Sequence, residues 1–287
     1  MIFPDSELPI NSDGSAFHLH LKPEQITDRI ILVGDPGRVD MISGMLDSVR
    51  FSMFSREFKS VIGTYRGKEV MALSTGIGSD NIDIVVNELD ALANIDYSTR
   101  TEKAEHRTLT LVRVGTCGAI QEDLPVGTYL VSEKSVGMDG VLNYYPAVND
   151  VSDADFEQEF CRQTGVLDRW ARPYVVSSDS ELVERIGKDM HKGVTITAVG
   201  FYAPQGRCLR GGLAHPDFNE RLRAFRYGRY RITNYEMESS ALEGMARMLG
   251  HKAMTVCLVV ANRYSKSMFT DYHGSMEGLV RTVLDRI

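Results

Sequence analysis

The sequence has no long apolar run. No stretch approaches the ~18 apolar residues that a transmembrane helix requires. Residues 1–15 are polar and acidic and contain two prolines, a composition that is not typical of a signal peptide. We therefore expect a protein that neither crosses nor binds a membrane.

Cysteine is scarce, with four residues in 287 that lie far apart, at Cys117, Cys161, Cys208 and Cys257. Neither a CxxC pair nor an HExxH motif occurs, and the seven histidines are scattered, so we predict no metal site. Isolated cysteines in and beside predicted strands are typical of buried free thiols in a reducing cytoplasm.

Positive charge is also in deficit, since 32 Lys and Arg face 39 Asp and Glu for a net charge of -7. This balance argues against nonspecific binding to nucleic acid, but a local arginine cluster can still hold a small anion. The phosphate loop GxxxxGK[ST] is absent, and the stretch from Gly76 to Asn81 lacks the third glycine of the dinucleotide motif. Both absences argue against ATP or NAD as the ligand.

What is present is an alternation of strand-like and helix-like segments. The expected strands are 29–33, 61–65, 69–74, 109–114, 128–132, 174–177, 194–199 and 253–260. The expected helices are 39–46, 82–93, 181–190, a segment from Met237 onward, and 276–284. The alternation predicts an α/β sandwich in one domain. We interpret 1–25 as an irregular arm and about 143–172 as an insertion over one sheet edge.

Glycine turns follow three of the expected strands, at 34–37, 76–78 and 115–118. Ligands of α/β sheets bind at the carboxyl ends of strands, and glycine lets backbone N–H groups approach an anion. Each turn alone is ordinary turn chemistry. Arg38 follows the first turn, and Arg113 lies in an apolar strand before the third. Arg113 could hold an anion, pair with a carboxylate, or stay hydrated on an edge strand.

Two further segments carry polar groups that could read a ligand. Phe201, Gln205 and Arg207 could recognise a planar heterocycle with carbonyl edges, although an ordinary surface loop explains them at least as well. Glu236, Met237 and Glu238 could grip sugar hydroxyls. From these three residues alone a structural role at a helix start is favoured, because carboxylates suit that end of the helix dipole.

Taken in order, these motifs resemble the nucleoside phosphorylase family and, within it, the uridine phosphorylases. The matching stretches are Phe17-His18-Leu19, Gly34-Asp35-Pro36-x-Arg38-Val39, Arg56-Glu57-Phe58, Ser74-Thr75-Gly76-Ile77-Gly78, Arg113-Val114-Gly115-Thr116-x-Gly118-Ala119-Ile120-Gln121, Gln205-x-Arg207, Asn234-Tyr235-Glu236-Met237-Glu238-Ser239 and Asn262-Arg263. The resemblance implies a single domain over 1–287, built as a three-layer α/β/α sandwich with a central mixed sheet.

The resemblance also implies a role for each matching residue. The implied catalytic residues are Arg113, Glu238 and Arg38, and phosphate would be held by Gly34, Arg38, Arg56, Arg113 and Thr116. Ribose would be bound by His18, Thr116, Met237 and Glu238, and the base by Phe201, Gln205, Arg207 and Glu236. His18 and Arg56 would come from a neighbouring subunit.

The implied activity is the reversible phosphorolysis of uridine to uracil and ribose 1-phosphate, a pentosyltransferase reaction of pyrimidine salvage. Inorganic phosphate is the co-substrate and no metal or organic cofactor is implied. The family unit is a dimer with shared active sites, and three dimers form a hexamer in bacterial relatives. The alternatives are a purine nucleoside phosphorylase, a nucleoside hydrolase and a non-catalytic nucleoside-binding module.

Three departures from the family pattern bear on these expectations. Gly206 stands where a glutamate is common, and Cys117 replaces a common threonine. Some relatives bind a monovalent cation such as K⁺ through a glutamate, matched by Glu57, and a serine, which is Asn81 here and argues against the ion. No carboxylate follows the last strand at 259–263, where purine-specific relatives carry an aspartate.

Overall fold

The computed structural model describes residues 2–287 and places every expected strand in one ten-stranded sheet. Its strands are β1 (Arg29–Val33), β2 (Ser48–Ser55), β3 (Phe58–Tyr65), β4 (Lys68–Ser74), β7 (Thr110–Ala119), β8 (Tyr129–Gly137), β9 (Tyr174–Ser177), β10 (His191–Thr197), β11 (Ile232–Glu236) and β12 (Lys252–Asn262). Two short strands, β5 (Ile95–Asp96) and β6 (Thr101–Glu102), pair separately.

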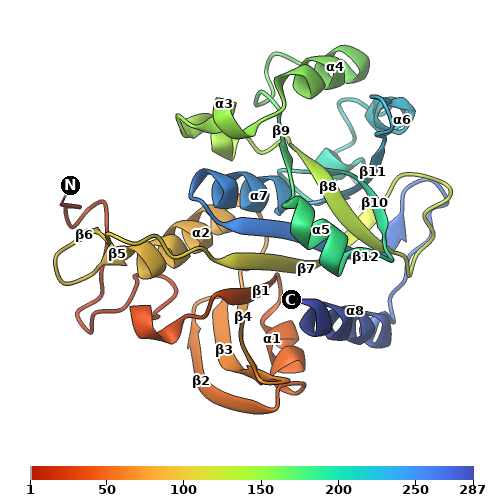
Figure 1. Ribbon diagram of the computed structural model, residues 1–287. Helices are drawn as coiled ribbons and strands as arrows, with labels where there is room; N and C mark the ends of the chain where they lie inside the picture. Colours follow the sequence, from red (N-terminus) through yellow and green to blue (C-terminus); the bar gives the residue numbers. More distant parts are fainter. Residues whose placement is uncertain (1) are drawn as a thin grey trace.

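Eight α-helices surround this sheet in the described part of the chain (Figure 1). They are α1 (Pro36–Ser43), α2 (Ser79–Asn94), α3 (Val148–Val151), α4 (Ala154–Thr164), α5 (Ser180–Ile186), α6 (Phe218–Ala224), α7 (Ser239–Met248) and α8 (His273–Arg286). Three 3₁₀ turns complete the elements: η1 (Pro23–Gln25), η2 (Val141–Tyr144) and η3 (Ala203–Gln205). No helix within residues 2–287 is long and apolar enough to cross a bilayer.

The sheet is mixed, which confirms the expected architecture. Its order is β11-β10-β8-β12-β7-β1-β4-β3-β2, with β9 paired to β8. β1 runs parallel to β4 and β7, whereas β2, β3 and β4 are antiparallel. β11 also pairs with β7, through Asn234 opposite Ala119 and Tyr235 opposite Gly118. This last pairing closes β7, β12, β8, β10 and β11 into a ring that the sequence does not predict.

Three apolar clusters attach the helices to the sheet. The helices α2 and α7 share one cluster with β1, β4 and β7. The helices α1, α5 and α8 share a second, and α4 and α6 pack with β10 and β11 in a third. The segment 143–172 contains α3 and α4, and Figure 1 shows both beside β9. Residues 2–25 hold no α-helix.

The expected turn at 115–118 is wrong, because these residues continue β7 as far as Ala119. The glycines make room for two guanidinium groups. A Cβ atom on Gly115 would lie 2.2 Å from Nη1 of Arg113, and one on Gly118 would lie 2.8 Å from Nη2 of Arg263. Glycine in this strand therefore marks a close approach by side chains rather than a change of chain direction.

Three smaller expectations also change. Asn234–Glu236 ends a strand and α7 begins at Ser239, so Met237 lies before the helix. The helix expected at 181–190 ends at Ile186, followed by Gly187. Cys117 and Cys257 are buried as predicted, but Cys161 is only partly buried and Cys208 is exposed.

Candidate active site

Four of the five predicted phosphate residues, all but Arg56, lie near the end of β1 and the middle of β7. Leu32 lies opposite Arg113 in the parallel pairing, so Gly34 is level with Gly115, one residue before Thr116. A Cβ atom on Gly34 would lie 3.4 Å from the carbonyl oxygen of Gly76, so the first two glycine turns are neighbours. Arg38, in the first turn of α1, reaches to 3.5 Å from the carbonyl oxygen of Val114. Gly34, Gly76 and Arg38 therefore gather at the carboxyl ends of strands, where α/β sheets bind their ligands.

Arg113 lies at the inner wall of this site and is only 5% exposed. Its Nη2 pairs with Oε2 of Glu238, and its Nη1 lies 3.4 Å from Oε2 of Glu236. Burial alone would lower the pKa of Arg113, but the two carboxylates outweigh it and raise that pKa, so the guanidinium is charged. The ion-pair interpretation is thus correct. Nε of Arg113 has no partner among the described residues.

Glu236 fixes the start of α7. Its Oε2 accepts the backbone N–H groups of Glu238 and Ser239, both at 2.8 Å, and its Oε1 accepts the hydroxyls of Thr197 at 2.8 Å and Ser239 at 2.7 Å. Four hydrogen bonds and a nearby guanidinium therefore satisfy this buried carboxylate. A contact between Glu236 and a base stays a prediction.

Glu238 joins three elements at one point. Its Oε1 accepts the backbone N–H of Gly78 at 2.7 Å, at the start of α2, and its Oε2 accepts from Arg113 on β7. Burial raises the pKa of Glu238, and the Arg113 charge offsets part of that rise. The half-buried Met237 precedes it, and the Met237 carbonyl accepts from the Ser79 hydroxyl at 3.3 Å. Met237 and Glu238 therefore lie beside Arg113 and the start of α2, and their contact with ribose stays a prediction.

The predicted base residues also form one cluster. Oε1 of the buried Gln205 accepts from Nη1 of Arg207 at 2.8 Å and from Nη2 of Arg263 at 3.2 Å. The Arg207 guanidinium lies over the Phe201 ring, 3.5 Å from its centroid. Burial, with the Arg263 charge, lowers the pKa of Arg207 to about 10. Two guanidiniums and an amide thus converge beside the ring face of Phe201, on a loop that immediately follows β10.

A family model described as the Phosphorylase superfamily matches residues 28–281. The chain belongs to the Phosphorylase superfamily. It is 31% identical to the uridine phosphorylase of Thermococcus kodakarensis over 91% of this chain and 82% of that relative. It is 30% identical to the uridine phosphorylase of Escherichia coli, over 88% of each. A crystal structure of the Trypanosoma brucei nucleoside phosphorylase, described as showing uridine phosphorylase activity, superposes with a TM-score of 0.89 at 32% identity over 97% of this chain and 98% of that one.

In this member of the superfamily, His18 and Arg56 are not in the cluster around Arg113. Nδ1 of His18 lies 2.6 Å from Oε1 of Glu88. Glu88 is ten residues along α2 from Gly78, which corresponds to about 15 Å of helix. The exposed Arg56 guanidinium lies 5.7 Å from the centroid of the Phe17 ring. Both residues belong to one surface patch, made of Phe17, His18 and Arg56.

Arg263 joins the Gln205 cluster, a contact that the sequence motifs do not predict. It follows Asn262, whose side chain is fully used in shaping the turn after β12. Nδ2 of Asn262 donates to the carbonyls of Gln121 and Leu124, each at 2.8 Å, and its Oδ1 accepts the N–H groups of Tyr264 and Ser265. Asn262 therefore aims Arg263 at Gln205, and in the sequence the pair is marked only as the last stretch that matches the family.

The residues at the family's cation position contact each other directly. Nδ2 of Asn81 lies 3.3 Å from Oε1 of Glu57. A Cβ atom on Gly76 would lie 2.4 Å from the same amide nitrogen. The Asn81 amide therefore occupies the space between Glu57 and the second glycine turn.

Two scattered histidines do converge, contrary to expectation, near Asp90. Nε2 of His251 lies 3.1 Å from Oδ1 of Asp90, and Nδ1 of His251 accepts the backbone N–H of Leu109 at 3.1 Å. With Nδ1 as acceptor, Nε2 carries the hydrogen and donates it to Asp90. A metal-bound imidazole would instead donate from its second nitrogen, so His251 does not fit a metal ligand.

Proposed function

We propose that this chain is a uridine phosphorylase, which converts uridine and inorganic phosphate to uracil and ribose 1-phosphate, and the reverse. The observation that carries the proposal is the central position of the Arg113–Glu238 pair. Arg38 reaches the carbonyl of Val114, next to Arg113 on β7, and Arg263, which donates to Gln205, lies against Gly118 five residues farther along the same strand. The names of the curated relatives, at about one-third identity over most of the chain, support the same reaction.

The geometry suggests how the reaction would proceed. Arg38 and Arg113 would hold phosphate against the anomeric carbon while Glu238 accepts hydrogen bonds from the 2′ and 3′ hydroxyls. An oxygen–C1′ bond forms as the C1′–N1 bond breaks, and its electron pair leaves with uracil. The phosphate and Glu238 stabilise the positive charge that develops on the ribose. Arg207, the Gln205 amide and Arg263 would stabilise the negative charge on the uracil oxygens, and N1 finally takes a proton.

The rival activities find less support in these contacts. The groups around Gln205 are hydrogen-bond donors, which suit the carbonyl oxygens of uracil, and no carboxylate stands at 259–263 to meet a purine N7. A hydrolase would have no use for Arg38 beside Gly34 and Thr116. A non-catalytic binding module would not require Arg113 and Glu238 to be buried together between two sites.

We propose further that two copies share their active sites. The Phe17, His18 and Arg56 patch would complete the ribose and phosphate sites of a partner copy. Three such dimers would form a hexamer, and the enzyme would serve cytoplasmic pyrimidine salvage. The Asn81 amide would replace the monovalent cation beside Glu57, so K⁺ would not be needed for activity.

A substrate panel tests the proposal. Uridine, deoxyuridine, thymidine and inosine are incubated with and without phosphate, and free base is measured. We expect uracil release only with phosphate, and little release of hypoxanthine. Turnover that persists after phosphate is removed would contradict the proposal. Gln205→Ala should reduce the preference for uridine over inosine, and an unchanged preference would show that the base binds elsewhere.

A further inference from the structure

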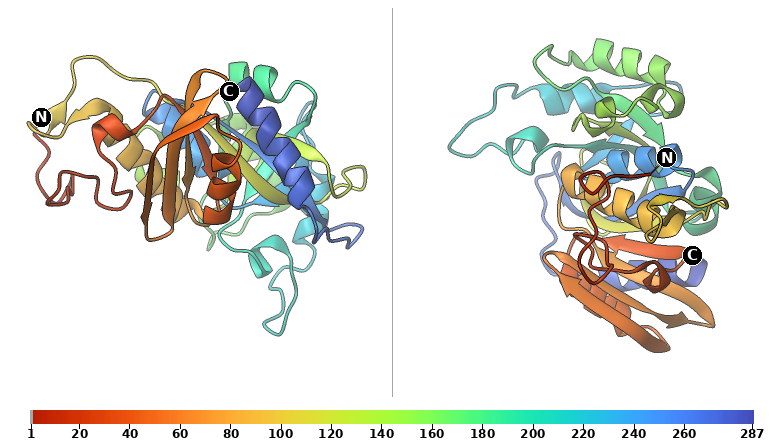
Figure 2. Two further views of the ribbon diagram at one scale, coloured as in Figure 1. Left: turned by 90° about the horizontal axis from the view of Figure 1, so that it is seen from below. Right: turned by 90° about the vertical axis from the view of Figure 1, so that its left-hand side faces the viewer.

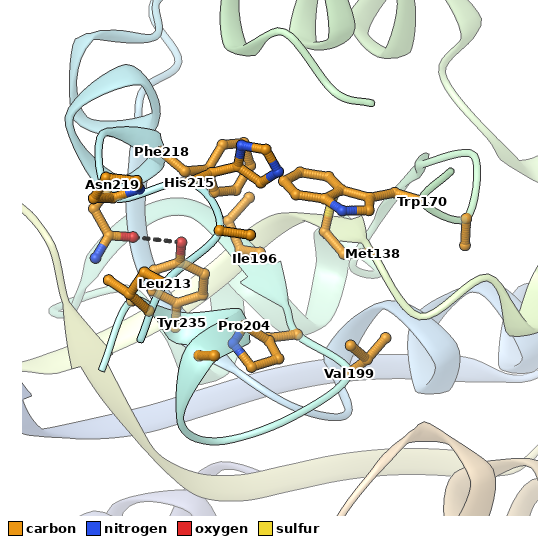
Figure 3. A pocket seen from close by; sticks show the side chains of 16 residues that line it. Met138, Trp170, Ile196, Val199, Pro204, Leu213, His215, Phe218, Asn219 and Tyr235 are labelled. Atoms are coloured by element: carbon orange, nitrogen blue, oxygen red, sulfur yellow. Dashed lines mark hydrogen bonds between the residues drawn. The ribbon is translucent and has the colours of Figure 1, made fainter. Parts of the chain in front are cut away.

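An apolar cavity of about 380 Å³ lies beside the candidate base site. Figure 3 shows its side chains, which come from separate segments of the chain. The largest are Met138, Trp170, Ile196, His215, Phe218 and Tyr235. The lining contains no Asp, Glu, Lys or Arg. A volume in this range with an apolar lining is typical of a small-molecule site.

The cavity is separate from the base site but shares a wall with it. Ala203, Pro204 and Gly206 line the cavity, whereas Gln205 turns the other way, toward Arg263. The short turn η3 therefore separates the two spaces. The loop that follows η3 projects from the body of the molecule, as both views of Figure 2 show around residues 205–215.

The shared wall is held by a specific contact. Gly206 has a φ of +71°, and a Cβ atom on it would lie 2.1 Å from Nδ2 of Asn219. Oδ1 of Asn219 accepts the Tyr235 hydroxyl at 2.7 Å, a bond drawn in Figure 3. Asn219 and Tyr235 both line the cavity, so a ligand there would press on the residues that pack against the Gln205 loop.

The lining indicates the class of ligand. Trp170 meets His215 and Phe218 edge to face, with ring centroids 5.3 and 5.0 Å away, which favours a planar aromatic guest. The rim adds a cation: Nη2 of the exposed Arg169 lies 3.3 Å from Nε2 of His215. Within residues 2–287 Arg169 forms no ion pair with a carboxylate. An anionic group on the ligand would supply that partner.

We propose that this cavity binds an aromatic carboxylate and that its occupancy changes the affinity of the neighbouring base site. Binding itself is independent of the proposed function. Only the coupling rests on the uridine site. Because η3 is a common wall, a guest that displaces Gly206 or Asn219 also moves Gln205, and the two affinities must change by the same factor.

Trp170 is the only tryptophan of the chain, so its fluorescence reports on the cavity directly. Biphenyl-4-carboxylate serves as the probe. We expect saturable quenching with a Kd below about 1 mM, which persists in saturating uracil and phosphate. Ala214→Phe, which fills the cavity, should weaken binding about tenfold or more, whereas Leu209→Phe, on the exposed loop outside the lining, should not.

Three outcomes would overturn the binding proposal: no saturable quenching, full displacement by uracil as in simple competition, or equal binding by Ala214→Phe. Replacing Arg169 with alanine should remove the preference for the acid over biphenyl-4-methanol, and a retained preference would place the carboxylate elsewhere. For the coupling, probe at saturation should change the uridine KM about threefold or more. An unchanged KM with proven binding would refute the coupling alone, and a chain without uridine turnover would refute the proposed function alone.

Discussion

Glu236 and Glu238 look equivalent in the sequence but differ completely in their contacts. Glu236 accepts four hydrogen bonds from the protein, whereas Glu238 accepts one backbone N–H and the Arg113 guanidinium. A carboxylate with free accepting capacity can bind ribose hydroxyls, and one that is already satisfied cannot. The family motif predicts that Glu236 and Glu238 both belong to the site, but only their contacts distinguish their roles.

This difference predicts different consequences for two matched substitutions. Glu238→Gln should lower kcat/KM for uridine about 100-fold, because the amide stabilises developing positive charge poorly, and should also lower stability, because the buried Arg113 is left with only Glu236 as a counter-ion. Glu236→Gln should cost about 1–3 kcal/mol of stability, because its amide nitrogen cannot accept the bonds that cap α7. Uridine kinetics and urea unfolding of both variants measure the split. Equal losses of activity and stability in the two variants would contradict the assignment.

Glu243 is a second buried carboxylate, on α7, with no counter-ion. Its Oε2 accepts the Ser135 hydroxyl at 2.7 Å, and its Oε1 has no partner among the described residues. Burial raises the pKa of Glu243 from 4.5 to about 8. The folded protein therefore holds a proton that the unfolded chain lacks between those two pH values.

The sign of the resulting pH dependence follows directly. As the pH rises through that window, Glu243 should reduce the free energy of unfolding by about 1.4 kcal/mol per pH unit, and the loss should stop once the folded state also ionises. Glu243→Gln should flatten the unfolding free energy between pH 5 and pH 8 relative to the parent chain. Exposed Glu122→Gln is the charge-matched control. An identical slope in parent and Glu243→Gln would show that Glu243 ionises normally.

At the scale of elements, apolar runs and turns made most of the sheet predictable. The strand predicted at 174–177 matches β9 to the residue, and those predicted at 61–65 and 69–74 fall within β3 and β4. β11 was missed because its sequence, Ile-Thr-Asn-Tyr-Glu, is half polar. Its polar side chains form hydrogen bonds inside the closed ring of strands. For example, the Asn234 amide oxygen accepts from the Thr195 hydroxyl. A one-dimensional hydrophobic pattern cannot reveal a strand stabilised by such distant partners.

The sequence predicts the start of β7 correctly but places its end too early. Its glycines follow an apolar run, so local pattern favours a turn, yet they continue the strand beneath Arg113 and Arg263. Gly118→Ala should therefore displace the Arg263 guanidinium and raise the uridine KM about tenfold, with circular dichroism unchanged. Gly274→Ala, where an added Cβ meets nothing within 4 Å, is the matched control and should leave KM unchanged. A normal KM in Gly118→Ala would show that Arg263 does not contribute to base binding.

At the scale of the whole molecule, the sheet joins residues from both ends of the chain in one site. β1, β7 and β12 are adjacent, so Gly34, Arg113 and Arg263 lie on or just after neighbouring strands although more than 200 residues separate the first from the last. Sequence located these residues only through the family resemblance. From the residue pattern alone, Arg113 could bind an anion or form an ion pair. Its partners could not be identified, because Glu236 lies on β11 and Glu238 lies just before α7.

The proposed sharing of active sites between two copies accounts for the positions of His18 and Arg56. Both lie in the exposed patch with Phe17, away from Arg113, and His18 is held by Glu88 about 15 Å along α2 from the Glu238 contact. In a twofold dimer the Phe17, His18 and Arg56 patch of each copy would face the active site of the partner. Each active site would then need an intact patch from one copy and an intact Arg113 from the other. Two inactive variants damaged in different halves should then complement each other.

Arg56→Ala damages the patch and Arg113→Lys damages the Arg113–Glu238 pair, and each homodimer should be nearly inactive. When the two are unfolded together and refolded at equal amounts, half of the dimers pair one chain of each kind. One of the two sites in such a dimer combines an intact Arg113 with an intact Arg56, so about a quarter of the normal activity should return. Mixing without refolding is the control and should restore activity only as subunits exchange. If refolded mixtures stay inactive while size measurements show mixed dimers, each chain carries its whole site, and Arg56 must reach the phosphate of its own chain.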